Sequence, residues 1–201
     1  ISNWTTDEVN AKVGFRVGVG TEYAFNDMWS LQPTLFFSTK GGKLDSGEIM
    51  GVNAKVTVNQ MYLELPVMAA ARFNVADNTN IVVSAGPYLA YGVGGKTKAT
   101  VEYQGQKATA KMNTFGKIDK MTIEAGGQSH DIPLGDILDP SEYDLSDMKG
   151  LNRFDFGLGV GVALEYQKFI VGLDGQFGLT KLETDTGKNL NFAISVGYKF
   201  W

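Results

Sequence analysis

The sequence predicts an all-β fold, an antiparallel up-and-down barrel whose strands cross a membrane. Three observations support this fold class. Apolar and polar residues alternate with a period of two in seven segments, as expected of strands whose two faces meet different surroundings. The apolar face of these segments carries no Asp, Glu, Lys or Arg. The connections between the segments alternate between short and long, which is the pattern of bacterial membrane barrels.

Length and composition limit the alternatives. The 201 residues fit one domain, so we expect residues 1–201 to form a single barrel domain with a long external loop at about 96–152. The lack of Cys excludes disulfides and thiolate metal sites. No run of about 18 apolar residues is present to form a membrane-spanning helix. The net charge is −4 and no basic stripe with interleaved aromatic residues occurs, which argues against nucleic acid as a partner.

The seven alternating segments are residues 11–25, 29–39, 61–72, 81–93, 153–166, 169–179 and 190–201. Val56 and Val58 precede the third segment and are apolar in the opposite phase. We interpret this change of phase as a bulge or as an extension of the strand outside the membrane. Pro33, Pro66 and Pro87 lie within segments, where each removes a hydrogen bond from the ladder, and we expect bulges at these positions.

Charged residues within the strands are confined to the face opposite the apolar one. An Arg or Lys in the middle of a lipid-facing surface would cost roughly 2–4 kcal/mol, so we expect these side chains to point into a narrow lumen and pair there. The alternative is a soluble barrel or sandwich with its apolar face inward. Its exterior would be dense in Lys and Glu, whereas the polar face here is rich in Gly. The predicted structural network of the interior consists of Arg16, Glu22, Glu64, Arg72, Arg153, Asp155, Glu165, Asp174 and Lys199.

Aromatic residues gather near both ends of the strands, as in the two aromatic girdles of a membrane barrel. One set adjoins the short connections and the C-terminus and comprises Tyr23, Phe25, Trp29, Phe73, Tyr166, Phe169, Tyr198, Phe200 and Trp201. A second set lies near the longer connections and comprises Phe37, Tyr91, Phe154, Phe177 and Phe192. We expect the two sets to face the two interfaces between lipid and water.

The lengths of the connections assign the two sides of the barrel. The short ones, at 26–28, 74–80 and 167–168, are expected on the periplasmic side. The longer ones, at about 40–55, 96–152 and 182–189, are expected outside. Seven strands leave two edges whose backbone groups have no partners in lipid. We therefore expect an eighth strand, either upstream of Ile1 or reduced to a stub at Ile1–Trp4.

The longest connection contains local patterns of its own. Residues 96–112 alternate and turn near Gly105, which predicts a hairpin that extends the barrel outward. The exposed strand edge of such a hairpin could accept a strand from a partner. A short helical turn is expected around Ser141–Met148, with Ser141 as its cap.

The stretch SLQPTLFFSTKGGKL, followed by YLELPVMAAARF, resembles the outer-membrane β-barrel (porin-like) family of Bacteroidetes, and the chain is similar to the small eight-stranded barrels of the OmpA/OmpX type. The resemblance covers residues 11–201 except the loop at 96–152, and it implies a location in the bacterial outer membrane with its lipid as a partner. The closing GYKFW resembles the C-terminal signal read by the barrel-assembly machinery, which implies that this machinery is a partner. Gly197, Tyr198 and Phe200 stand at the matching places, and Trp201 lies one residue beyond the usual terminal aromatic.

The sequence carries little that resembles a catalytic, cofactor or metal site. Ser129, His130 and Asp131 are the residue types of a hydrolase triad, but triads assemble from separated segments, and a solvated loop is the simpler interpretation. The acidic run at 136–147 lacks the pattern of a helix–loop–helix calcium site. The Gly-x-Gly runs are not followed by a helix and do not indicate nucleotide binding. We therefore expect no enzyme activity, no cofactor and no bound metal.

Three functions are compatible with such a barrel. The favoured one is an outer-membrane barrel with a packed polar interior that presents surface loops for structural, adhesion or ligand-binding roles, as a monomer with an unknown surface ligand. The second is a narrow channel for small solutes, although an eight-stranded lumen leaves little open space. The third is an outer-membrane enzyme that modifies lipid, for which the sequence offers only the cluster around His130.

Overall fold

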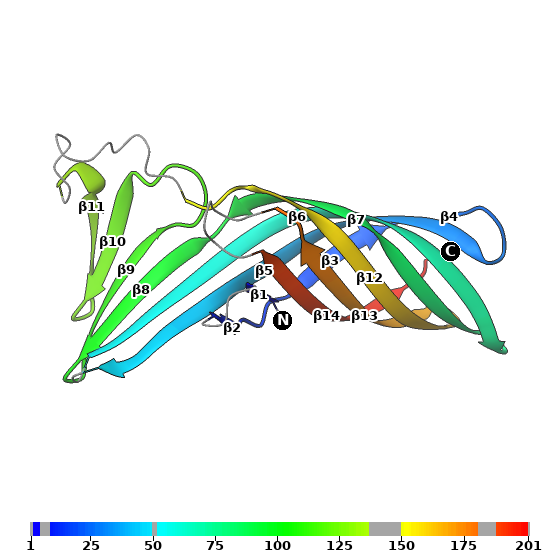
Figure 1. The fold of residues 1–201 in the computed structure, drawn as a ribbon, viewed down its shortest axis with the longest axis horizontal. Helices are drawn as coiled ribbons and strands as arrows, with labels where there is room; N and C mark the ends of the chain where they lie inside the picture. Colours follow the sequence, from blue (N-terminus) through cyan, green and yellow to red (C-terminus); the bar gives the residue numbers. More distant parts are fainter. Residues whose placement is uncertain (1, 5–8, 50–51, 137–149, 181–187, 201) are drawn as a thin grey trace.

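The computed structural model describes residues 2–4, 9–49, 52–136, 150–180 and 188–200. In these residues the chain forms one sheet of 14 strands, in which neighbouring strands run antiparallel. The strands curl around an interior at the right of Figure 1 and continue as a long ribbon of sheet at the left. The predicted all-β class and the antiparallel pairing are confirmed. No helix in this part of the chain is long and apolar enough to cross a membrane.

The curled part of the sheet contains the predicted strands. They are β3 (Arg16–Gly20), β4 (Tyr23–Ala24), β5 (Trp29–Ile49), β6 (Val52–Ala76), β7 (Thr79–Gly94), β12 (Phe154–Tyr166), β13 (Phe169–Gly178) and β14 (Asn189–Tyr198). β3 and β4 pair in series with β5, and each later strand pairs with the next. β7 and β12 are also neighbours, although 59 residues separate them in the sequence.

Within the described ranges the sheet is not closed into a complete cylinder. β1 (Ser2–Trp4) pairs antiparallel with the first residues of β14, whereas β2 (Val9–Ala11) pairs with β5. From Phe192 to Tyr198, β14 has a described neighbour only on its β13 side. Ser2–Trp4 therefore forms a short strand where a stub was expected, Ile1 lies outside the described residues, and the eighth full strand stays a prediction.

Two of the connections expected to be loops consist largely of strands. β5 and β6 form a hairpin of 21 and 25 residues that occupies the expected loop at about 40–55. The predicted loop at 96–152 contains β8 (Lys96–Tyr103), β9 (Gln106–Asn113), β10 (Lys120–Ala125), β11 (Gln128–Pro133) and the 3-10 turn η1 (Leu134–Asp136). The hairpin expected at 96–112 is confirmed, with its turn at Gln104 and Gly105, both of which have positive φ. The helical turn expected at Ser141–Met148 lies outside the described residues.

The change of phase at Val56 and Val58 marks an extension of β6 beyond the barrel. The β6–β7 pairing also shifts its register between Met61 and Tyr62, just below this extension. The β5–β6 register has no shift from Trp29 to Asp45, so alternate residues point to the same side along this whole length. In the barrel this side faces the lumen and carries polar residues such as Glu64. Above the barrel the same side carries Val56 and the buried Val58. A sheet outside lipid buries an apolar face, as in soluble proteins.

The three prolines within the strands do not cause bulges, and that expectation is wrong. The register is the same on both sides of Pro33 in β5, of Pro66 in β6 and of Pro87 in β7. Instead, the paired positions stop for two residues after Pro33 and again after Pro66, and then resume in the same register. A short gap in the ladder, and not a bulge, thus accommodates the missing N–H donor of each proline.

The outward face of the barrel is a continuous apolar surface. Val17, Leu65 and Leu173 are 62%, 43% and 57% exposed, whereas Glu64 is fully buried. The sorting predicted from the alternation is therefore confirmed. A continuous apolar surface that covers the outside of a barrel is unfavourable in water and suits contact with hydrocarbon.

Aromatic side chains border this apolar surface at both ends. Near the short turns, the rings of Phe169 and Tyr198 meet edge to face with centroids 5.4 Å apart. At the other end, Phe177 and Phe192 meet in the same way at 6.3 Å, and Tyr91 pairs directly with Phe154 across β7 and β12. The two expected bands of aromatic residues are thus present in the described residues, and Trp201 lies outside them.

Candidate functional site

Four charged side chains from separate parts of the chain meet at the end of the lumen near the short turns. Arg72 of β6 donates from Nη2 to Glu22 Oε1 at 2.7 Å and from Nε to Glu165 Oε2 at 2.9 Å. Lys199 Nζ lies 2.8 Å from Glu165 Oε1 and 3.5 Å from Glu22 Oε2. Each carboxylate therefore contacts both cations, which is the local balance that buried ions require.

A second ion pair lies in the middle of the lumen. Arg16 of β3 donates from Nη2 to Asp174 Oδ2 of β13 at 2.8 Å, and Ser195 donates from Oγ to the same oxygen at 2.9 Å. The Arg16 guanidinium also lies 4.2 Å from the centre of the Phe36 ring. A cavity of about 140 Å³ borders these residues and Gly159, and it has room for a few water molecules.

The most deeply buried ion pair lies toward the outer end of the lumen. Lys40 Nζ of β5 lies 2.6 Å from Glu64 Oε1 of β6, and the two side chains are 1% and 0% exposed. Ser38 Oγ donates to Glu64 Oε1 at 2.5 Å and Gln176 Nε2 donates to Glu64 Oε2 at 3.2 Å. Asn191 Nδ2 in turn donates to Gln176 Oε1 at 3.2 Å. The Glu64 carboxylate thus has several donors as well as its cation, which a buried charge needs.

Asp155 and Arg153 depart from the expectation that each interior charge pairs with an opposite one. The buried carboxylate of Asp155 accepts hydrogen bonds from Tyr88 Oη at 3.1 Å, Thr180 Oγ1 at 2.7 Å and Asn189 Nδ2 at 2.8 Å. Arg153 donates from Nη1 to a backbone carbonyl oxygen at 2.8 Å, and no carboxylate of the described residues pairs with it. Neutral donors and acceptors therefore satisfy these two groups.

A single aromatic side chain closes the outer end of the lumen. Phe115, between β9 and β10, is 4% exposed, and its ring meets the Tyr62 ring edge to face at 5.3 Å. Its backbone bridges to Leu151, and the Arg153 guanidinium lies 5.9 Å from its ring centre. A Cβ at Gly92 would lie 2.7 Å from the Phe115 ring, so only glycine leaves room for the ring at this position. We call the segment from Thr114 to Gly116 the cap.

The residues around His130 do not form a catalytic arrangement. His130 lies on β11 opposite Ile123 and is exposed. Asp131 accepts hydrogen bonds from Lys120 Nζ and Thr122 Oγ1, each at 2.6 Å, and these contacts lower the pKa of Asp131. The Asp131 side chain therefore stabilises the pairing of β10 with β11. Within the described ranges no group of three or more His, Asp or Glu residues is placed to hold a metal ion.

Two other predicted features are only partly described. Of the acidic run at 136–147, Asp136 is described and exposed, and the rest lies outside the described residues. Gly197 and Tyr198 end β14, and the Tyr198 ring meets the Phe200 ring edge to face at 5.4 Å. Nothing in this geometry tests the role of Gly197, Tyr198 and Phe200 as an assembly signal, which stays a prediction.

The sequence reasoning missed Lys40 and Phe115. Lys40 continues the lumen-facing alternation of Ser38, but the glycines at 41 and 42 indicated a loop and hid this signal. Phe115 is a lone aromatic residue in a polar stretch, and a lone aromatic has no period from which its contacts can be predicted.

Comparison with known proteins agrees with this geometry. A family model described as an outer membrane protein beta-barrel domain matches residues 2–183. No curated protein and no solved structure matches the chain. The matched range covers β1 to β13, including the ribbon of β8 to β11. With its apolar outer surface, charged interior and family match, the chain belongs to the outer membrane protein β-barrel domain family and is located in the bacterial outer membrane.

Proposed function

We propose that this protein is a non-conducting, monomeric, eight-stranded barrel that displays the sheet of β8 to β11 at the cell surface for adhesion or ligand binding. The observation that carries the proposal is the length of the β5–β6 hairpin. A strand needs about 9–11 residues to cross a membrane, and β6 has 25. The additional residues support β8, which pairs with β6 from Val52 to Val58 and starts the displayed sheet.

The contents of the lumen support the absence of conduction and of enzyme activity. Ion pairs and hydrogen bonds occupy three successive levels, the cavity between them holds about 140 Å³, and Phe115 covers the outer end. A hydrated solute would have to displace several buried charged groups at once. In planar lipid bilayers we expect the purified protein to give no current steps above the protein-free membrane. Steps that vanish when Gly159 is replaced by Trp would favour the narrow channel instead.

The edges of β3 and β14 that lack a neighbour in the described residues support the count of eight. β3 and β14 both run toward the side of the short turns, so one strand between them would pair antiparallel with each. Direct closure would instead place β3 and β14 about 4.8 Å apart, within reach of a disulfide. The chain has no Cys, so pairs of introduced cysteines between residues 17–19 and 192–196 provide a clean test. We expect no crosslink, and efficient crosslinking in the intact protein would contradict the eighth strand.

The role of the displayed sheet can be separated from that of the barrel. Gly92 N donates to Arg153 O at 2.6 Å, so β7 and β12 are already neighbours where the ribbon leaves the barrel. Replacing residues 94–151 by an Asn-Gly turn would join them as a tight hairpin. Cells that carry the intact protein or this shortened form are then compared on surfaces coated with collagen, fibronectin or mucin. We expect only the intact protein to increase attachment, and equal attachment by both forms would contradict the surface role.

A further inference from the structure

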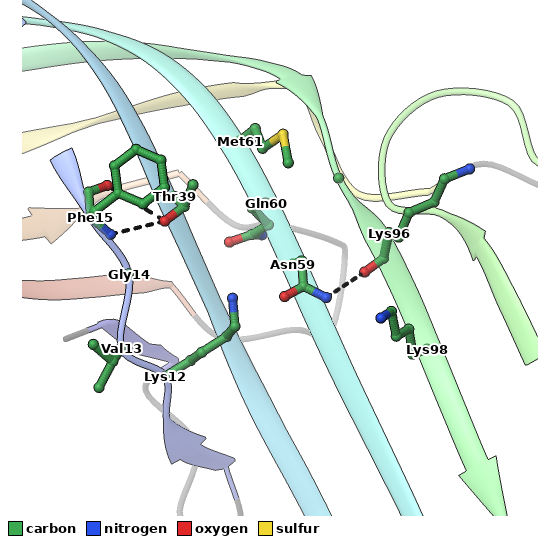
Figure 2. A pocket seen from close by; sticks show the side chains of 11 residues that line it. Lys12, Val13, Gly14, Phe15, Thr39, Asn59, Gln60, Met61, Lys96 and Lys98 are labelled. Atoms are coloured by element: carbon green, nitrogen blue, oxygen red, sulfur yellow. Dashed lines mark hydrogen bonds between the residues drawn. The ribbon is translucent and has the colours of Figure 1, made fainter. Parts of the chain in front are cut away.

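The strongest unassigned feature is a basic hollow on the outer wall of the barrel. It has a volume of about 780 Å³ and is lined by the chain before β3, which runs beside β5, and by residues of β5, β6 and the start of β8 (Figure 2). Lys12 and Lys98 approach it from its two sides, and Asn59 lies between them. Val13, Phe15 and Met61 form an apolar part of its wall, and Thr39, Gln60 and Lys96 line the rest together with glycines.

The register shows that this hollow faces outward and not into the lumen. Residues directly opposite in neighbouring strands share a face, so Lys43, Thr57 and Lys98 point to the same side. Alternation along β5 gives Lys43 the same side as the lipid-facing Phe37. A Cβ at position 41 would lie 3.3 Å from Lys12 Cδ, which places the stem of that lysine over the same face of β5.

The register also gives the height of the hollow. Asn59 lies four residues beyond Leu63 on β6, and Leu63 is directly paired with Phe37 and Tyr91 of the outer aromatic band. At about 3.3 Å per residue and a strand tilt of about 40°, Asn59 lies roughly 10 Å above that band. The head-group layer of a bilayer is about 5–8 Å thick, so the hollow begins within this layer at Met61 and reaches its outer edge at Asn59.

Lys12 and Lys98 line the hollow, and Lys43 lies beside it on the same face of the sheet. These three lysines differ from their neighbours in their partners. Lys96, which also lines the hollow, donates to Asn113 Oδ1, and Lys111 and Lys120 pair with Glu124 and Asp131. In contrast, Lys12, Lys43 and Lys98 have no carboxylate partner among the described residues.

The uncompensated charges act on one another. Burial of Lys12 and the positive charges of Lys43 and Lys98 lower the pKa of Lys12. Positive charges held together without a counter-charge are unfavourable, and a bound anion would relieve the repulsion.

We propose that Lys12, Lys43 and Lys98 bind the phosphate group of an anionic lipid in the outer leaflet, with the acyl chains of that lipid against the apolar surface below. The position above Phe37, the apolar wall and the unpaired lysines carry this assignment. A soluble anion would use the charges alone and would have no need of Val13, Phe15 and Met61. Each lysine near an anionic lipid surface contributes roughly 1 kcal/mol, so three together can retain a lipid.

The test measures lipid retained by the full-length protein in native mass spectrometry from detergent micelles. Equal amounts of dioleoylphosphatidylglycerol, which is anionic, and dioleoylphosphatidylcholine, which has no net charge, are added. We expect preferential retention of phosphatidylglycerol, and a roughly tenfold loss of that retention in the triple variant K12Q/K43Q/K98Q. The matched control K107Q/K117Q/K120Q removes the same charge from parts of the ribbon outside the hollow, and we expect it to change retention by less than about twofold.

Three results would overturn the proposal. The first is full retention of phosphatidylglycerol by the triple variant, and the second is an equal loss in the control variant. The third is displacement of the lipid by millimolar inorganic phosphate, which would identify the hollow as a site for free anions. A heat-dependent shift on gels, the same for all forms, shows that the variants are folded.

Discussion

Arg72 joins two carboxylates that come from separate parts of the barrel wall. Its guanidinium reaches Glu22 between β3 and β4 and Glu165 on β12, and these contacts connect strands that are not neighbours in the sheet. Backbone ladders link only adjacent strands. Side chains that cross the lumen therefore add a second kind of connection, which resists flattening of the curled sheet.

We expect Arg72→Gln to lower the free energy of unfolding by about 2–4 kcal/mol, because it leaves two largely buried carboxylates with Lys199 as their remaining cation. Urea-induced unfolding in lipid vesicles, followed by tryptophan fluorescence, measures the change. Lys107→Gln is the control, since its ion pair with Glu102 is exposed and contributes less than about 1 kcal/mol. Equal effects of the two substitutions would show that Arg72 has no special role.

At the scale of elements, the cap is the part of the ribbon that enters the barrel. Thr114 Oγ1 donates to Asn59 O at 2.8 Å and Leu151 N donates to Thr114 O at 2.8 Å, so the cap is tied to β6 and to the start of β12. Phe115 then packs on Tyr62 inside the wall. The cap thus fixes the displayed sheet at a second point besides the pairing of β8 with β6.

We expect Phe115→Ala to release the cap while the barrel stays folded, because the substitution removes the only ring of the cap and leaves a cavity. Trypsin should then cleave after Lys117 much faster than in the unaltered protein, as seen by mass spectrometry of the fragments. Tyr103→Ala is the control, because Tyr103 lies exposed at the end of β8. Unchanged cleavage at Lys117 would mean that Phe115 does not hold the cap.

The elements differ in how far the sequence could predict them. The alternation of apolar and polar residues predicts each strand of the barrel and which of its sides faces lipid, because lipid excludes charged residues from that side at every position. The part of β6 above the barrel was ambiguous, because Val56 and Val58 are apolar residues on the side of the strand that carries polar residues within the barrel. The alternation of side chains along β6 is nevertheless unchanged. The partners of the interior charges depend on the register between strands, and the alternation within one strand does not contain this information. That is why Lys40 as the partner of Glu64 could not be predicted.

For the whole molecule, the barrel and the ribbon are distinct in their surroundings but share β5 and β6. The barrel buries polar groups and exposes apolar ones, so it is stable only in lipid or detergent. We expect unheated protein to migrate faster on a denaturing gel than heated protein, as a compact barrel that resists the detergent. The form shortened at 94–151 should keep this shift, and loss of the shift would mean that the barrel depends on the ribbon.

The register between β5 and β6, which is unbroken from Trp29 to Asp45, has a consequence for how β6 tolerates mutation. Near Gln60 the medium around the strand changes from hydrocarbon to water, while the backbone keeps its alternation. Aspartate at the outward-facing odd positions should therefore be harmful at 61, 63 and 65 and tolerated at 59 and 57. The position at which the harmful effect on this face ends would locate the membrane surface on this protein to within two residues.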